Sequence, residues 1–128
     1  MEVNNLFRYV DASSRIEIKD AFVSVLPVNI DSKDVLLESL ALKLAFPDYF
    51  GFNWDALFDC LRDFSWIEER DILLVHQELP KLSSEELKVY LRLLRDAILD
   101  WRPGEAHRFG VVFSLVDKES VERLLRDG

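Results

Sequence analysis

Three aspartates at regular intervals are the residues of this chain whose types and spacing are best suited to chemistry. Asp55, Asp59 and Asp63 follow one another at intervals of four, the spacing that places side chains on one face of an α-helix. Like charges at this spacing repel by roughly 0.2–0.5 kcal/mol, so helix stability does not explain the stripe. The carboxylates could form a solvated surface, contact a basic partner or contribute to a metal site.

A metal site would need further ligands, because Mg²⁺ and Ca²⁺ take oxygens that converge from several directions. A single helix presents its carboxylates along a line. Glycine-rich phosphate loops and the patterns GxSxG, HExxH and CxxC do not occur. His76 and His107 are far apart, and His76 is interpreted as a surface or hydrogen-bonded histidine. We predict a non-enzymatic protein without metal or cofactor; a metal-dependent hydrolase built on the three aspartates is the less favoured alternative.

The aspartate stripe is expected on a helix that starts after an aromatic loop. The side chain of Asn53 can cap the free amides of this helix. Pro47 and Gly51 favour a turn before it. Its apolar face repeats at helical spacing through about Phe64 and contains Trp54, Leu57, Phe58 and Leu61. Cys60 falls near this face and is interpreted as a small buried hydrophobe.

Residues 47–61, PDYFGFNWDALFDCL, resemble the characteristic segment of the barstar family, which consists of intracellular inhibitors of barnase-type ribonucleases. The matching features are a proline and an acid, an aromatic pair, a glycine, an asparagine two residues later, and then Asp-Ala-Leu, an aromatic residue and Asp-Cys-Leu. The resemblance is dense over residues 46–61 and looser over residues 21–114. It implies a small α/β protein that blocks the basic active site of a ribonuclease with acidic side chains, as an immunity protein against a ribonuclease toxin.

The resemblance also implies which residues contact the partner. Asp59 matches the central contact in the catalytic cleft, where a carboxylate takes the place of a substrate phosphate, and Asp55 matches a second contact. Asp96 falls where family members usually carry a glutamate. The other matching positions are an aromatic anchor and two loop residues: Tyr49, Gly51 and Asn53.

Several residues of the segment depart from the family pattern. Phe58 stands where well-known members have tryptophan, Phe52 where they often have an acid, and Trp54 where they have an aliphatic residue. Exposed aromatic side chains beside the acids would favour a protein interface, so Trp54 and Phe58 are included among the predicted contacts. Core packing at helical spacing is the alternative for Trp54. The partner could also be a basic protein without ribonuclease activity.

Composition agrees with a basic protein partner. The 128 residues carry a formal net charge of −8 with a pI of about 4.7, which disfavours nucleic acid and anionic membranes. Acidity alone is also common in soluble proteins. The single cysteine fits a reducing compartment, and no signal peptide or membrane-spanning run is evident. We therefore expect a cytoplasmic protein that is monomeric when free.

The remaining elements predict a single α/β domain with a small, mainly parallel sheet of three strands and helices packed against it. Apolar runs typical of buried strands occupy residues 21–26, 71–76 and 109–114. Helices are expected from Asp31 or Ser32 to before Pro47, and from the capping-box residue Ser83 to about Trp101. Residues 1–20 form an extension containing a hairpin or short strand, and residues 115–128 form a tail helix.

Overall fold

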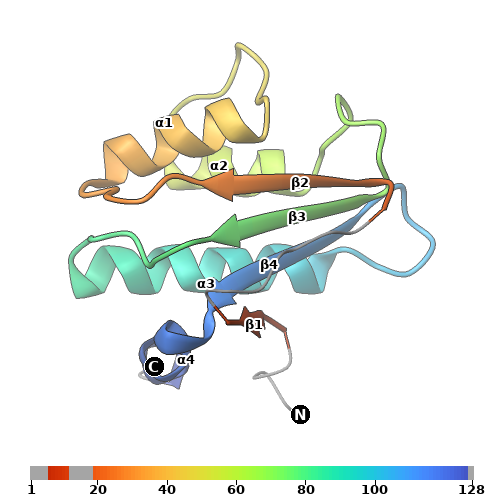
Figure 1. The fold of residues 1–128 in the computed structure, drawn as a ribbon. Helices are drawn as coiled ribbons and strands as arrows, with labels where there is room; N and C mark the ends of the chain where they lie inside the picture. The colour runs from red at the N-terminus through yellow and green to blue at the C-terminus, as the bar shows by residue number, and fades with distance from the viewer. Residues whose placement is uncertain (1–5, 12–18, 127–128) are drawn as a thin grey trace.

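The computed structural model describes residues 6–11 and 19–126. Four strands form one parallel sheet in the order β1-β4-β3-β2 (Figure 1). The three predicted strands are present as β2 (Ala21–Leu26), β3 (Asp71–His76) and β4 (Arg108–Ser114). The predicted α/β class is therefore confirmed, but the prediction of three strands is wrong by one.

The fourth strand comes from the N-terminal extension. β1 (Arg8–Val10) pairs in parallel with β4, with Arg8 opposite Val112. Because the pairing is parallel and its partner lies about a hundred residues away in the sequence, it is not the local hairpin that the sequence suggested. The expected turn over residues 11–14 and the alternating segment 15–19 lie largely outside the described residues.

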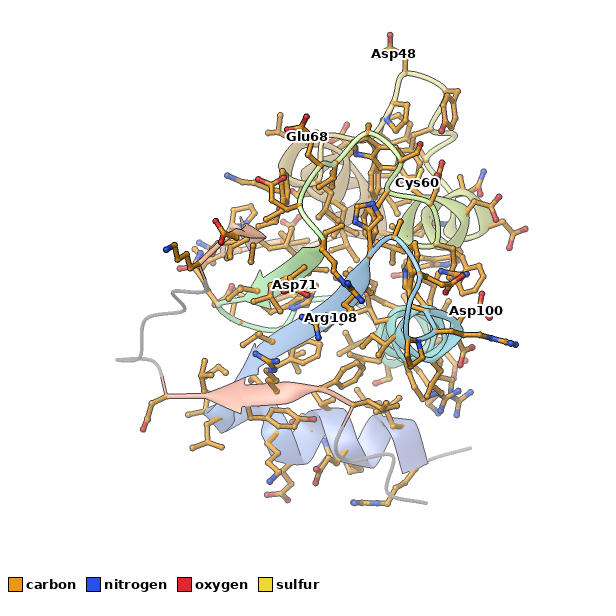
Figure 2. All side chains as sticks on the ribbon, turned by 90° about the vertical axis from the view of Figure 1, so that its right-hand side faces the viewer. Asp48, Cys60, Glu68, Asp71, Asp100 and Arg108 are labelled. Atoms are coloured by element: carbon orange, nitrogen blue, oxygen red, sulfur yellow. The ribbon has the colours of Figure 1, made fainter. Side chains whose placement is uncertain are left out.

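Three helices cover one face of the sheet (Figures 1 and 2). They are α1 (Lys33–Lys43), α2 (Trp54–Leu61) and α3 (Ser84–Asp100). Alternate residues of the strands, such as Ile72 and Leu74, join the helices in the main core. Leu73, Val75 and Val112 form a smaller cluster on the other face.

Helix starts agree with the capping predictions. The hydroxyl of Ser32 accepts a hydrogen bond from the Val35 amide at 3.2 Å, and that of Ser83 accepts one from the Glu86 amide at 3.1 Å. These bonds satisfy backbone donors that a helix leaves free at its first turn. The tail begins with a 3₁₀ turn, η2 (Leu115–Asp117), before α4 (Lys118–Arg126). No helix in the described ranges has the length and apolar character needed to cross a bilayer.

Candidate functional site

Asn53 organises the start of α2. Its Oδ1 accepts a hydrogen bond from the Ala56 amide at 2.8 Å, and its Nδ2 donates to the Gly51 carbonyl at 3.2 Å. The residue with left-handed backbone in this turn is Phe52, with φ of 52°, and Gly51 does not have a positive φ. The turn that the sequence assigned to Gly51 therefore depends on Phe52 and on the Asn53 side chain.

The predicted stripe of three aspartates is shortened to two. Asp55 and Asp59 lie on the exposed face of α2, but α2 ends at Leu61 and not near Phe64 as predicted. Phe64 has a φ of 52°, which is incompatible with a continuing helix. Asp63 therefore leaves the stripe.

Asp63 instead holds the connection that follows α2. Its Oδ1 accepts a hydrogen bond from the Ser65 amide at 3.2 Å, and its Oδ2 accepts one from the Tyr49 hydroxyl at 3.4 Å. Among the residues that the structure describes, no group of three or more His, Cys, Asp or Glu side chains is arranged to hold a metal ion. The arrangement thus gives no support to a metal centre built on the three aspartates.

A groove of about 540 Å³ lies between α2 and α3. It brings together five of the eight predicted contact residues, which are Trp54, Asp55, Phe58, Asp59 and Asp96. The two helices contribute these residues from positions up to 42 apart in the sequence. Acidic side chains and aromatic walls therefore share one surface depression.

Sequence reasoning missed the other residues of the groove, Val89, Arg92 and Leu93 on α3. Together with Asp96 they recur at intervals of three to four along the helix. This spacing could have shown that these residues share one face of α3. It could not have shown that α2 lies opposite that face. Arg92 brings a positive charge to a depression whose other charged groups are carboxylates.

Trp54 packs against the core and also lines the groove. Its ring is half-buried against the main core, 6.3 Å from the ring of Tyr90, and it also lines the groove. The ammonium of Lys33 lies 5.4 Å from the centre of the indole ring, close enough for a cation–π interaction. Phe58 is likewise half-buried and lines the groove. The aromatic walls are therefore anchored in the fold.

The aromatic loop before α2 projects from the body, with Asp48 at its tip (Figure 2). Phe50 is buried and packs against Phe46 and Phe52, each at 4.8 Å between ring centres. Tyr49 is 72% exposed and Phe52 is 52% exposed. Tyr49, Gly51 and Asn53 do not line the groove but lie on this loop, so the predicted contacts form a loop region and a groove region.

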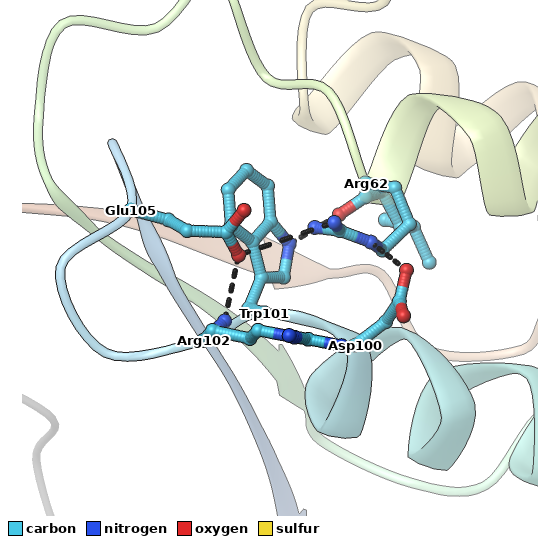
Figure 3. A network of polar contacts seen from close by, with 6 residues as sticks. Arg62, Asp100, Trp101, Arg102 and Glu105 are labelled. Atoms are coloured by element: carbon cyan, nitrogen blue, oxygen red, sulfur yellow. Dashed lines mark hydrogen bonds and ion pairs between the residues drawn. The ribbon is translucent and has the colours of Figure 1, made fainter.

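A polar network ties the end of α2 to the end of α3 (Figure 3). The Arg62 guanidinium donates to the Asp100 carboxylate and lies 4.2 Å from the centre of the Trp101 ring. The indole Nε1 of Trp101 donates to the Leu61 carbonyl at 2.8 Å. These contacts fix the ends of the two helices that carry Asp59 and Asp96 relative to each other.

The two histidines and the cysteine are buried inside the protein. His76 is 2% exposed and bonded to the Tyr90 hydroxyl at 2.7 Å, which confirms the hydrogen-bonded interpretation and not the surface one. Nδ1 of His107 lies 2.8 Å from the Glu69 carbonyl. Burial, assisted by the charges of Asp63 and Asp59, raises the pKa of Cys60 to about 11, so this thiol is protonated at neutral pH.

Comparison with known proteins gives one family match. Residues 21–117 match the family described as "Barstar (barnase inhibitor)". No individual curated protein matches the chain. The matched segment contains β2, the aromatic loop, the groove and the whole 3₁₀ turn, and it excludes β1 and α4. Since the match covers most of the 128 residues and the structure has the expected α/β fold with a parallel sheet, the chain belongs to the barstar family.

Proposed function

We propose that this protein inhibits a ribonuclease toxin by covering its active site with the groove and the aromatic loop. The observation that carries the proposal is the convergence of Asp55, Asp59 and Asp96 on one groove with aromatic walls. A ribonuclease that cleaves RNA must present cationic side chains to phosphate groups. Carboxylates held on a folded surface can accept the same charge-assisted hydrogen bonds as a phosphate group. They pair well with arginine.

Asp59 is the carboxylate proposed to enter the catalytic cleft. It lies on the exposed face of the two-turn helix α2, whose start is capped by Asn53 and whose end is tied to α3 through Trp101. Because the helix is fixed at both ends, little conformational entropy is lost when the partner binds. Asp55 and Asp96 would then pair with cations at the rim of the cleft.

The exposed aromatic side chains supply the apolar part of the proposed interface. Phe52 packs against the buried Phe50, and the Tyr49 hydroxyl donates to Asp63. Trp54 and Phe58 are partly embedded in the core. Rigid aromatic residues next to desolvated charge pairs are typical of binding hot spots. The net charge of −8 would speed the approach of a basic partner.

The proposal is tested by titrating the protein into activity assays of barnase-type and related ribonucleases. Asp59→Asn keeps the shape of the side chain and removes its charge. Glu119→Gln makes the same change in charge on α4, outside the proposed interface. We expect stoichiometric inhibition by the wild type and by Glu119→Gln, and binding weakened by about 2–5 kcal/mol in Asp59→Asn, mostly through faster dissociation.

The assay also separates the possible outcomes. Equal inhibition by Asp59→Asn and the wild type would remove Asp59 from the central position. Absence of inhibition across all the ribonucleases would contradict the proposed target class and direct the search to a basic partner without nuclease activity. An association rate that does not fall as salt concentration rises would contradict electrostatic attraction.

A further inference from the structure

A second pocket, of about 310 Å³, lies beyond the C-terminal end of α3, at the edge where β3 and β4 begin. It is distinct from the acidic groove and shares no residue with it. Its charged residues are all arginines, and its lining contains no carboxylate. The arginine and ring-bearing side chains used in the argument are Arg70, Trp101, Arg102, His107, Arg108 and Phe109. Three arginines around one pocket are unexpected in a protein whose net charge is −8.

Two carboxylates close to this pocket, Asp71 and Asp100, already have cationic partners. Asp71 accepts two hydrogen bonds from Arg108, at 2.7 Å and 3.0 Å, and the two side chains lie next to each other in Figure 2. The Arg108 hydrogen bond, together with the charges of Arg108, Arg70 and Arg8, lowers the pKa of Asp71. Asp100 is paired with Arg62. These two carboxylates are therefore paired with arginines.

Two guanidinium groups remain for a ligand. Within residues 6–11 and 19–126, neither the Arg70 nor the Arg102 side chain donates a hydrogen bond to another residue. The Arg102 backbone is fixed instead, because its amide donates to Glu105 Oε1 at 2.6 Å (Figure 3). Among the described residues, Arg70 and Arg102 thus have guanidinium donors without a hydrogen-bond partner, and Arg102 holds its guanidinium on an anchored backbone.

The walls of the pocket are rigid and partly apolar. Trp101 is held by its bond to the Leu61 carbonyl and by the Arg62 guanidinium over its ring. Phe109 is 6% exposed and packs in the core. Nδ1 of His107 lies 2.8 Å from the Glu69 carbonyl, which fixes the orientation of this ring in the pocket wall. Charge-assisted hydrogen bonds are stronger beside such apolar walls than in open water.

We propose that this pocket binds a compact oxyanion of the phosphate type, with Arg70 and Arg102 as the principal donors. The planar guanidinium group matches the geometry of a phosphate and can bind it through two parallel hydrogen bonds. The ligand is either free phosphate or the terminal phosphate group of a small monoester. The acidic groove shares no lining residue with this pocket, so the proposed oxyanion site is independent of ribonuclease inhibition.

The test is a titration of isotopically labelled protein with inorganic phosphate at constant ionic strength, followed by nuclear magnetic resonance. We expect saturable shifts of the backbone amides of residues 101–109, apart from Pro103, and of the Trp101 indole. Arg102→Gln should weaken binding about tenfold, as expected for loss of one charged hydrogen bond. Arg123→Gln, an equal change in charge on exposed α4, should bind phosphate as the wild type does.

A parallel titration with glycerol 3-phosphate separates the two sources of the ligand, because tighter binding of one compound identifies it as the better match. Shifts that do not saturate with either compound would overturn the proposal. Equal binding by Arg102→Gln and the wild type would overturn it as well. Unchanged far-ultraviolet circular dichroism of the variants excludes a folding defect as the cause of any loss.

Discussion

Acidification should destabilise this protein through His76, which is 2% exposed in the core. Nδ1 of the ring lies 3.1 Å from the Val112 carbonyl, and Nε2 lies 2.7 Å from the Tyr90 hydroxyl. Because a carbonyl oxygen only accepts hydrogen bonds, Nδ1 carries the proton and Nε2 accepts from Tyr90. A second proton on Nε2 would place an unpaired charge in the core and break the present bond.

The size of the effect follows from the pKa of His76. Burial lowers this pKa from 6.5 to about 4, and the hydrogen bond to Val112 opposes the shift in part. Between these two pH values the unfolded chain binds more protons than the folded one, so the free energy of unfolding rises with pH. The contribution is complete above about pH 6.5. It is lost as the pH falls towards 4 and amounts to about 3 kcal/mol, at about 1.4 kcal/mol per pH unit.

The assay compares urea unfolding of the wild type and His76→Gln from pH 7.5 to pH 4 at fixed ionic strength. Glutamine does not titrate, and its amide can still donate to Val112 and accept from Tyr90. Carboxylates titrate in both proteins, so their contribution cancels in the difference. We expect the stability advantage of the wild type over His76→Gln to shrink by about 3 kcal/mol across this range.

One outcome would refute this reasoning. If the difference in unfolding free energy between the two proteins is the same at pH 7 and pH 4.5, protonation of His76 is not coupled to unfolding. The ring would then be accessible to water or able to find a new acceptor when charged. A parallel measurement of the histidine resonances would locate its pKa directly.

Two further predictions concern the surroundings of α2. Cys60 should resist thiol reagents in the native protein at pH 8, because it is buried and its pKa is raised to about 11; reaction as fast as in urea would contradict this. Trp101→Phe keeps an aromatic ring but removes the donor to the Leu61 carbonyl. It should lower the free energy of unfolding in urea by about 1–2 kcal/mol, and an unchanged value would show that this bond does not contribute to stability.

Local patterns in the sequence determined most elements of the fold. The strands β2 and β3 match the predicted ranges, and Ser32, Asn53 and Ser83 cap their helices as expected. These features depend on interactions between residues a few positions apart, such as a cap with the third following amide. They are therefore encoded in short segments and can be recognised without knowledge of the rest of the chain.

Errors in the predicted fold occurred where distant contacts decide the structure. β1 has three residues and acquires its strand pairing from β4, about a hundred positions later. α2 stops at Leu61 although its apolar spacing continues, because Phe64 turns its backbone to pack among Trp66, Trp101 and Phe109. A hydrophobic period shows that a side chain is buried, but it does not specify the backbone conformation that buries it.

The candidate site likewise depends partly on local sequence patterns and partly on distant contacts. Sequence spacing determined by itself that Asp55 and Asp59 share a helix face, because both lie on one regular element. Only the tertiary structure placed Asp96 across the groove from them, drew Asp63 away to Tyr49, and gathered arginines from three separate segments around a second pocket. These placements depend on how α2, α3 and the sheet pack together. Packing brings together residues that are far apart in the chain, and their separation in the sequence does not reveal their distance in space.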